Sequence, residues 1–332
     1  MNTRPAALVP VPLLVAVAIL GTAPYWVGRV GLYPYLALEI MIWMIFALGY
    51  NLLLGQGGLP SFGHGAFFGV GAYGFGLALK GGFGLWGALA MGIGGAALAG
   101  ALVGAFISHR RGIYYALLTI AFGQVFWFVA IKWHTVTGGE DGLLNIKRPP
   151  WIASNEALHF FALAAFVIVA LVLWRAVHSP WGRVLGAIKQ NETRAAFVGY
   201  DTWLYKWSAF TLSCAIAGVA GCLFALAQQS AYPNVMSLHQ SGFVVMMVLV
   251  GGGLVSFWGP VVGAAFFLLA RDLLGAYTET WLLWYGLLFM AMVLFKPDGI
   301  AGMWRDAMKR MVSDTFSDPG AKAPVSKAGK GV

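Results

Sequence analysis

The stretch from Leu32 to Leu54, LYPYLALEIMIWMIFALGYNLLL, contains one charged residue, Glu39, in 23 positions. At a rise of about 1.5 Å per residue, a helix of this length crosses the roughly 30 Å hydrocarbon core of a bilayer. The whole chain of 332 residues has the same character, with 60% hydrophobic residues, 10% charged residues and a mean hydropathy of +0.77. Soluble domains carry about 25% charged residues. The composition therefore excludes a soluble globular enzyme and predicts an all-α polytopic integral membrane protein.

Ten stretches of the chain are apolar enough to cross a membrane, or nearly so. They run approximately over Leu8–Pro24, Leu32–Leu54, Phe62–Leu79, Gly84–Ile107, Tyr114–Ile131, Ala157–Trp174, Trp207–Ala227, Gly242–Gly253, Trp258–Ala270 and Trp281–Phe295. The eighth and ninth contain only about 13 residues each, against the ~20 that a span requires. Glycines at 251–253 break any single long helix between them. The sequence predicts about ten transmembrane helices, two of them short, and leaves open whether the short pair are full spans or re-entrant.

The distribution of charge predicts the topology. Arg175–Lys206 carries five positive and two negative charges, whereas Gln228–Ser241 carries none. Because Lys and Arg accumulate on cytoplasmic loops, the first segment is predicted to be cytoplasmic, and so is the basic stretch after Phe295. Ten crossings then place both termini in the cytoplasm. Alternatively, the first apolar segment is a cleaved signal peptide, which leaves nine spans with the same orientation downstream.

The C-terminal end of the chain has a different composition from the rest. Ser313–Val332 is rich in Ala, Gly, Pro, Ser, Asp and Lys and shows no apolar period, which is typical of disorder. We therefore expect a membrane domain over residues 1–302 and a cytoplasmic, largely disordered tail over residues 303–332.

No pattern of catalytic, metal-binding or nucleic-acid-binding residues is visible in the sequence. It has no GxxxxGK[ST] phosphate loop, and its six His lack metal-ligand spacing. Gly69–Gly74 matches a dinucleotide fingerprint by letter, but no strand precedes it and no acidic residue follows at the required distance, so it is interpreted as a helix face. Cys214 and Cys222 are interpreted as small packing residues. The net charge of +9 is spread over short loops without a basic stripe interleaved with aromatics. The chain is predicted to be non-catalytic and to bind no nucleic acid.

Ionisable residues inside the predicted spans are scarce. Glu39 is the only acid within a long predicted span, and a charge at the bilayer centre costs at least about 2.5 kcal/mol. A proton- or sodium-driven carrier uses several such groups on different helices. The energy for movement is therefore expected to come from elsewhere. Glu39 itself either packs near the surface or lines a pathway.

Several stretches of the sequence carry a family resemblance. Gly57–Tyr73, GGLPSFGHGAFFGVGAY, closely resembles the permeases of branched-chain amino acid ABC importers of the LivM type. Further matches follow in the family's order: Arg111–Thr119, Thr137–Gly139 with Asp141–Leu143, Ser179–Arg183 running on to Gly199, Gly251–Gly253 with Gly259–Ala264, and Pro297–Gly302. Together they cover about residues 35–302. The ordered set is far more specific than any one stretch.

The resemblance implies a pore subunit of a bacterial importer in the cytoplasmic (inner) membrane. Its expected partners are a second, LivH-type permease, two ATP-binding cassette ATPases and a periplasmic binding protein. The chain itself then binds no cofactor, and ATP and Mg²⁺ are used by the partner subunits. The expected solute is a branched-chain or other hydrophobic amino acid, with urea, short amides or another small polar solute as the alternative. A stand-alone channel or ion-coupled carrier is the alternative from a different class.

The segment at about 179–206 resembles the cytoplasmic loop through which such permeases dock on the ATPase. The residues assigned to this coupling role are Gly182, Arg183, Ala187, Lys189, Arg194, Ala195, Ala196 and Gly199. We expect a short amphipathic helix that Gly199 ends in a left-handed conformation. The segment departs from the general importer loop of Glu-Ala-Ala, three residues, Gly, because Arg194 replaces the Glu and the Gly comes one residue early. A merely solvated basic loop is the alternative.

Two further groups of residues are singled out. Thr137, Gly138, Gly139, Glu140 and Asp141 lie in the longest predicted outer loop, where they are candidates for docking the binding protein or closing the outer mouth. Polar residues inside the predicted bundle are candidates for the translocation path: Asn51, Gln56, Ser61, His64, Thr119 and Gln124, together with Glu39. For each of the first six, an ordinary interhelical hydrogen bond is the alternative role.

Overall fold

The computed structural model describes residues 11–27, 33, 35–296, 298–304 and 306. This part of the chain contains no strand beyond one isolated bridge between Leu143 and Ala231, so the all-helical prediction is confirmed for it. The longer helices are α1 (Val11–Trp26), α2 (Tyr35–Asn51), α3 (Gly65–Lys80), α4 (Leu85–Ile107), α5 (Gly112–Lys132), α7 (Asn155–His178), α10 (Thr202–Gln228), α11 (Leu238–Gly251), α12 (Gly259–Tyr277) and α13 (Trp281–Phe295). The short elements are a π-helix (Leu52–Gly57) that continues α2, α6 (His134–Thr137), α8 (Pro180–Gln190), α9 (Glu192–Phe197), and 3-10 turns at Gly139–Asp141, Pro150–Ile152 and Pro233–Met236.

Six of these helices are long and apolar enough to cross a membrane. They are α2 with its π-helix, α4, α5, α7, α10 and α12, while α1, α11 and α13 contain shorter apolar runs. The predicted tail lies almost entirely outside the described residues, as does the beginning of the first predicted span.

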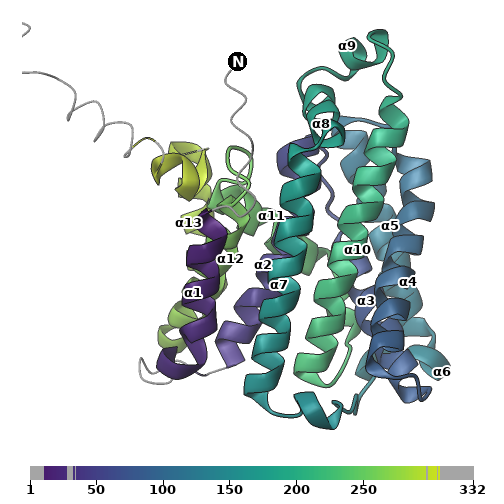
Figure 1. Cartoon of the computed structure of the whole chain (residues 1–332), viewed down its shortest axis with the longest axis vertical. Coiled ribbons are helices and arrows are strands. Elements are labelled where there is room, and N and C mark those ends of the chain that lie inside the picture. The colour runs from purple at the N-terminus through teal and green to yellow at the C-terminus, as the bar shows by residue number, and fades with distance from the viewer. Residues whose placement is uncertain (1–10, 28–32, 34, 297, 305, 307–332) are drawn as a thin grey trace, which may run out of the picture.

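Helix α10 lies in the middle of the bundle and packs against α2, α3 and α4 (Figure 1). Small residues permit the close approach: a Cβ added to Gly71 would lie 2.5 Å from the Cα of Gly218, and Gly100 faces Cys214. Both cysteines are buried and free, which confirms their interpretation as packing residues. Gly69–Gly74 lies within α3, as its interpretation as a helix face requires.

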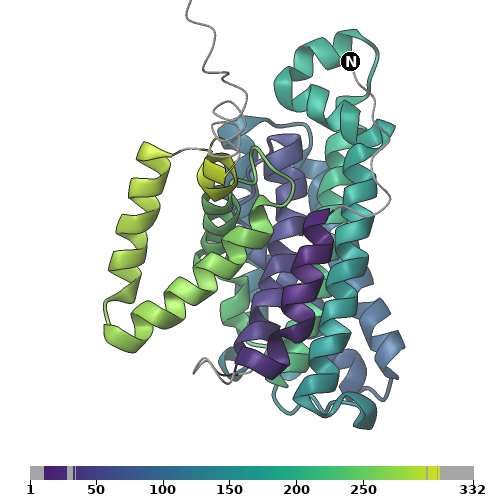
Figure 2. The ribbon, with the colours of Figure 1, turned by 60° about the vertical axis from the view of Figure 1, so that its left-hand side comes forward.

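The ninth predicted span is longer than its apolar run indicates. Helix α12 contains 19 residues and continues to Tyr277, so Arg271 and Asp272 lie within it. The prediction that Glu39 is the only acid inside a long span is therefore wrong. The apolar run ends at Ala270 because these two charges follow it, and the helix continues because they are paired, as described below. Figure 2 shows α12 slanting away from the bundle and α13 returning beside it.

Helix α11 ends at a glycine turn. Gly252 has φ +84°, and the N–H groups of Gly252 and Gly253 donate to the carbonyls of Leu249 and Val248. This arrangement satisfies the last carbonyls of the helix and requires a residue that tolerates positive φ. The glycine link predicted between the short pair of helices is thus the point where the chain reverses.

The loops divide between the two ends of the bundle. Helices α8 and α9 lie at one end with the α4–α5 turn, while α6 and the turns around it lie at the other (Figure 1). At the α6 end, Leu143 pairs with Ala231. These groupings agree with the predicted topology, in which 175–206 lies on one side and the outer loop that contains Thr137–Asp141 lies on the other.

Candidate functional site

A non-helical segment, Gly58–His64, enters the bundle between the π-helix and α3. The prediction that a span begins at Phe62 is wrong here, because the helix begins only at Gly65. Neighbouring helices satisfy the free backbone groups: the N–H of Ser61 donates to the Tyr50 hydroxyl, and the N–H of Phe62 donates to Thr119 Oγ1 at 3.1 Å. Irregular backbone at membrane depth is tolerated only where protein buries it or where it lines a cavity.

A second non-helical segment, Ser230–Ser237, approaches the same point from the opposite end. Contacts with three glycines of α3 follow this approach. The Leu143 side chain lies against Gly76, the Met236 side chain against Gly69 and the Val235 carbonyl against Gly65. Helix α11 then begins inside the bundle, which explains its length of only 14 residues. The second segment reaches Gly65, the residue that directly follows the first: a Cβ added there would lie 2.9 Å from the Val235 carbonyl, and the Gly65 N–H donates to Ser241 Oγ of α11 at 2.9 Å.

One glycine of the first segment is required by space. A Cβ on Gly63 would overlap the Thr119 carbonyl, and Gly123 of α5 lies directly opposite. The backbone of the segment therefore packs against the backbone of α5 with no side chain between them. Substitution of Gly63 requires one of the two to move.

Four of the seven path candidates lie close to this segment and are fully buried. Ser213 Oγ contacts His64 Nε2 at 2.9 Å and donates to the Gly49 carbonyl. Several polar atoms here have no protein partner, namely Ser61 Oγ, His64 Nδ1 and both side-chain atoms of Asn51. Thr119 is the fourth, and its hydroxyl donates to Ala116 while accepting from Phe62. Buried polar atoms without partners are costly, so this region contains unused hydrogen-bonding capacity.

The remaining three path candidates differ from these four in burial or position. Gln56 and Gln124 are half-buried. Glu39 lies on α2 and is paired with Arg271 of α12 through two hydrogen bonds of 2.9 Å. Asp272 also contacts Arg271 at 3.2 Å, and the Tyr33 hydroxyl donates to Asp272 at 2.7 Å. The structure thus separates Glu39 from the other six candidates.

The coupling segment forms two helices instead of the single helix that the sequence predicts. Ser179 caps α8, and Asn191 interrupts the helix and caps α9 by accepting from the Arg194 N–H. Asn191 is exposed and extended, and this local side-chain bond is the reason for the break.

Gly199 ends α9 as expected. Its φ is +99°, its N–H donates to Ala196, and the Tyr200 N–H donates to Ala195. Among the coupling candidates, Arg183, Ala187, Arg194 and Ala196 are exposed, whereas Gly182 and Ala195 are buried. Phe197 and Val198 are also strongly exposed at the tip of α9. This end therefore presents apolar and basic groups together.

Lys189 is also exposed as a residue, but its ammonium group is directed inward. Its Nζ donates to the carbonyl of Gly55 in the π-helix, and its stem lies against Gly58. Gly55 lies in the last turn of the π-helix, where carbonyls lack a partner within the helix. Lys189 supplies a donor for it. Partial burial lowers the pKa of its ammonium group through loss of hydration.

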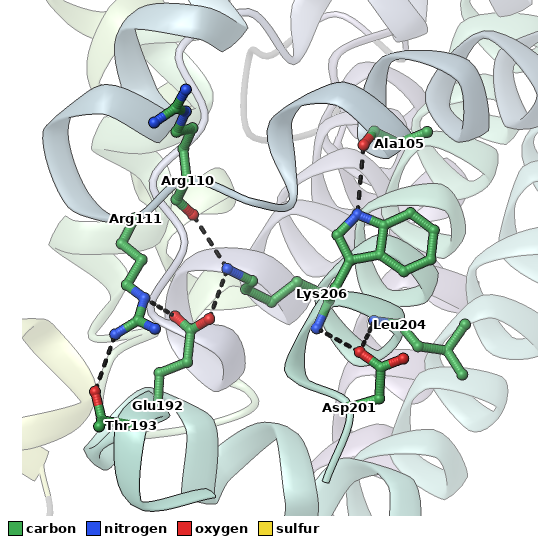
Figure 3. A network of polar contacts seen from close by, with 9 residues as sticks. Ala105, Arg110, Arg111, Glu192, Thr193, Asp201, Leu204 and Lys206 are labelled. Atoms are coloured by element: carbon green, nitrogen blue, oxygen red, sulfur yellow. Dashed lines mark hydrogen bonds and ion pairs between the residues drawn. The ribbon is translucent and has the colours of Figure 1, made fainter. Parts of the chain in front are cut away.

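An ion-pair network fixes α9 to the rest of the bundle (Figure 3). Glu192, the first residue of α9, lies between Arg111 at 2.9 Å and Lys206 of α10 at 2.8 Å. The Lys206 side chain is only 1% exposed and also donates to the Arg110 carbonyl. Neither Glu192 nor Lys206 is among the candidates from the sequence. In the sequence, the only sign of this pair is that Glu192 lies in a charged loop and that Lys206 is the single Lys near the start of an apolar helix.

The predicted outer-loop candidates form a compact turn at the α6 end. Thr137 is buried, and its hydroxyl donates to Ala130 and Trp133. Gly138 and Gly139 both have positive φ, while Glu140 and Asp141 are exposed. The turn thus presents two carboxylates on the surface of this end.

Arg148, a little further along the same loop, ties it to α10. Its guanidinium donates to the Leu226 and Ala227 carbonyls at the end of that helix. A cation at a helix C-terminus is stabilised by the helix dipole. Burial acts against the charge and lowers the pKa of Arg148.

Comparison with known proteins identifies the family of the chain. The sequence model described as "Branched-chain amino acid transport system / permease component" matches residues 33–296. The chain belongs to this permease family. The protein named "High-affinity branched-chain amino acid transport system permease protein LivM" of Escherichia coli (strain K12) is 30% identical over 325 residues, covering 89% of this chain and 76% of the relative.

Two other relatives carry similar names. The LivM of Salmonella typhimurium (strain LT2) is 29% identical with the same coverage. The "Probable branched-chain amino acid transport permease protein LivM" of Methanocaldococcus jannaschii is 21% identical over 56% of this chain and 59% of the relative. No solved structure shows a significant match. The family predicted from the sequence is thereby confirmed.

Within this permease, the matched region contains all the residues discussed above except those near the two ends of the chain. Among the described residues, no group of three or more His, Cys, Asp and Glu is placed to hold a metal ion. A shallow, open pocket of about 470 Å³ lies beside the α4–α5 turn, lined by Arg110, Tyr114, Leu117 and Leu118. None of the path candidates lines it.

Proposed function

We propose that this permease forms half of the translocation pore of an ATP-driven ABC importer for branched-chain and other hydrophobic amino acids. The observation that carries the proposal is that Gly58–His64 and Ser230–Ser237 interrupt the helices of an apolar bundle from opposite ends and come together at Gly65. Interrupted helices inside a bundle are typical of transporter binding regions. The names of the relatives supply the class of solute.

The residues that we propose to line the path lie close to this point. Asn51, Ser61, His64 and Thr119 lie on or against the first segment, and three of them have side-chain atoms without a protein partner. Gln56 and Gln124 extend the set. A second, LivH-type permease completes the pore, because a small solute needs a wall on more than one side. Glu39 instead fixes α2 to α12.

Energy enters at the α8–α9 end. We place two ATP-binding cassette ATPases there, with Arg183, Arg194 and the exposed tip at Phe197 in contact with them. ATP and Mg²⁺ belong to those partners. This chain is a non-catalytic subunit and uses no cofactor of its own.

The orientation follows from the same assignment. The α8–α9 end faces the cytoplasm of a bacterium, the α6 end faces the periplasm, and ten crossings of the inner membrane place both termini in the cytoplasm. The exposed Glu140 and Asp141 dock the periplasmic binding protein. The membrane domain covers 1–302 and the tail 303–332.

Uptake by cells tests this function. A strain that lacks this chain should lose ATP-dependent uptake of radiolabelled leucine, isoleucine or valine and regain it on complementation. The melting temperature of the binding protein encoded beside it should rise with these amino acids. Unchanged amino acid uptake, with loss of urea or short-amide uptake instead, would assign the permease to the alternative solutes.

A further inference from the structure

We propose that Lys189 and Glu192 are positioning residues that transmit movement of α8 and α9 to the buried segment Gly58–His64. The inference rests on the proposed function, since it assumes that α8 and α9 move with the ATPases. It concerns how that movement reaches the path. Two separate chains of contacts lead from these helices to the same segment.

The first chain of contacts runs through Lys189. Its ammonium group donates to the Gly55 carbonyl, which lies in the last turn of the π-helix and lacks a donor within that helix. Its stem packs against Gly58, which ends the π-helix with φ +65°. A displacement of α8 therefore acts directly on the first residue of the segment. π-helical turns inside α-helices are frequent at functional sites, and this one directly follows Asn51, whose carboxamide lacks a protein partner.

The second chain of contacts runs through Glu192. One carboxylate oxygen holds Arg111 and the other holds the buried Lys206 (Figure 3). Arg111 directly precedes α5, and its Nη1 also donates to Thr193. Helix α9 is thus attached to the first residues of α5 by two side chains. A rotation of α9 acts on α5 as a whole, because a helix moves as a rigid element.

Helix α5 reaches the segment two turns further along. Thr119 accepts the Phe62 N–H, and its backbone lies directly against Gly63. The contact is backbone to backbone, so no flexible side chain absorbs a displacement. The segment is therefore held at Gly58 by α8 and at Phe62 and Gly63 by α5.

Burial makes the second link sensitive to loss of charge. Lys206 is almost completely buried, and its ammonium group contacts Glu192 and the Arg110 carbonyl. Removal of one partner of a buried pair is strongly destabilising, whereas removal of both is often tolerated. The double variant Glu192→Gln/Lys206→Met therefore removes the link without leaving an isolated buried charge.

The experiment uses the complete transporter in proteoliposomes, with the second permease, the ATPases, the binding protein and leucine. The variants are Lys189→Met, Glu192→Gln and Glu192→Gln/Lys206→Met. Each should assemble and hydrolyse ATP, but leucine taken up per ATP hydrolysed should fall about fivefold or more, the lower range of allosteric couplings. Lys189→Arg keeps a hydrogen-bond donor and should therefore retain most of the leucine uptake per ATP hydrolysed. Gln190→Met, an exposed neighbour on α8, is the matched control and should behave as wild type.

A second readout distinguishes transmission from a merely structural role. With Cys214 and Cys222 replaced by Ala, a single Ser61→Cys reports on the segment through its rate of labelling by a thiol reagent. In the wild-type background this rate should change between nucleotide-free and ATP-bound transporter. In the Lys189→Met and double variants the change should be lost at an unaltered melting temperature.

Two results would overturn the inference. One is a wild-type ratio of uptake to hydrolysis in both Lys189→Met and the double variant. The other is nucleotide-dependent labelling of Ser61→Cys that persists in them. Absence of ATP-driven uptake in the wild type itself would overturn the proposed function, and this inference with it, so the two failures are distinguishable.

Discussion

Arg271 of α12 holds both carboxylate oxygens of Glu39 of α2 at 2.9 Å, across 232 positions of sequence. Asp272 and Tyr33 extend this pair into a cluster of four side chains. Loss of hydration and the bond to Asp272 raise the pKa of Tyr33 to about 12, so its hydroxyl remains a donor at any physiological pH. The cluster attaches the α12–α13 hairpin, which otherwise leans away from the bundle, to the central helix α2.

Breaking this pair should destabilise the permease. Arg271→Met leaves two carboxylates without their cation, and we expect a loss of about 3 kcal/mol of stability. The thermal midpoint in detergent, followed by size-exclusion chromatography, measures it. Because both partners are removed, Glu39→Leu/Arg271→Met should recover most of the loss. If the single variant melts like wild type, the cluster does not hold α12.

The lack of space around Gly63 predicts that a larger residue there reduces both stability and uptake. Gly63→Ala places a Cβ into the Thr119 carbonyl, and overpacking of this kind costs about 1–3 kcal/mol. We expect reduced leucine uptake together with a lower thermal midpoint. Gly94→Ala on α4, where an added Cβ meets nothing within 4 Å, is the matched control. Equal behaviour of the two variants would show that the segment does not pack against α5 as described.

The end of α9 predicts a coupling defect without a folding defect. Gly199→Val disfavours φ +99° but meets no neighbour, and Arg183→Glu reverses an exposed charge that we place against the ATPase. Both variants should insert normally and allow basal ATP hydrolysis, while uptake and substrate-stimulated hydrolysis fall together.

Gly186→Val serves as the control for this pair, since Gly186 lies within α8 and also meets no neighbour. Full uptake by Gly199→Val or by Arg183→Glu at normal expression would remove that residue from the coupling assignment. Full uptake by both would remove the whole loop from it.

Labelling with an impermeant thiol reagent tests the orientation. Cysteines at the exposed positions Glu140 and Asn234, close to Pro233, should react from outside the cell, and one at Asn191 should react only after permeabilisation. Cys214 and Cys222 are buried and contribute little background. Labelling of Asn191 from outside would reverse the topology derived from positive charge.

The sequence was sufficient to predict the helices because long apolar runs have few alternatives in a membrane. Asn155–His178 and Trp281–Phe295 lie close to their predicted bounds. The entry of Gly58–His64 into the bundle was not predictable in the same way. Within lipid, a buried loop and a helix have similar composition, so Phe62 and its apolar neighbours suggested a span that begins too early.

The polar contacts were harder to predict than the helices. Glu192 and Lys206 are 14 positions apart in a charged loop and at a helix start, and only the tertiary fold brings them together. Arg271 was assigned to a loop because a charge ended the apolar run, although Glu39 makes its place in α12 favourable. The seven path candidates could be named because polar side chains are rare in an apolar bundle, but their partners depend on packing that a single sequence does not contain.

Uptake of leucine by reconstituted proteoliposomes tests the central claim most directly. The purified chain alone, or with the second permease only, should transport no leucine under any ion gradient or with ATP. Addition of the ATPases, the binding protein and Mg-ATP should produce uptake against a concentration gradient. Transport of solute by the chain alone, without ATP, would contradict the account and assign the protein to the channels or ion-coupled carriers.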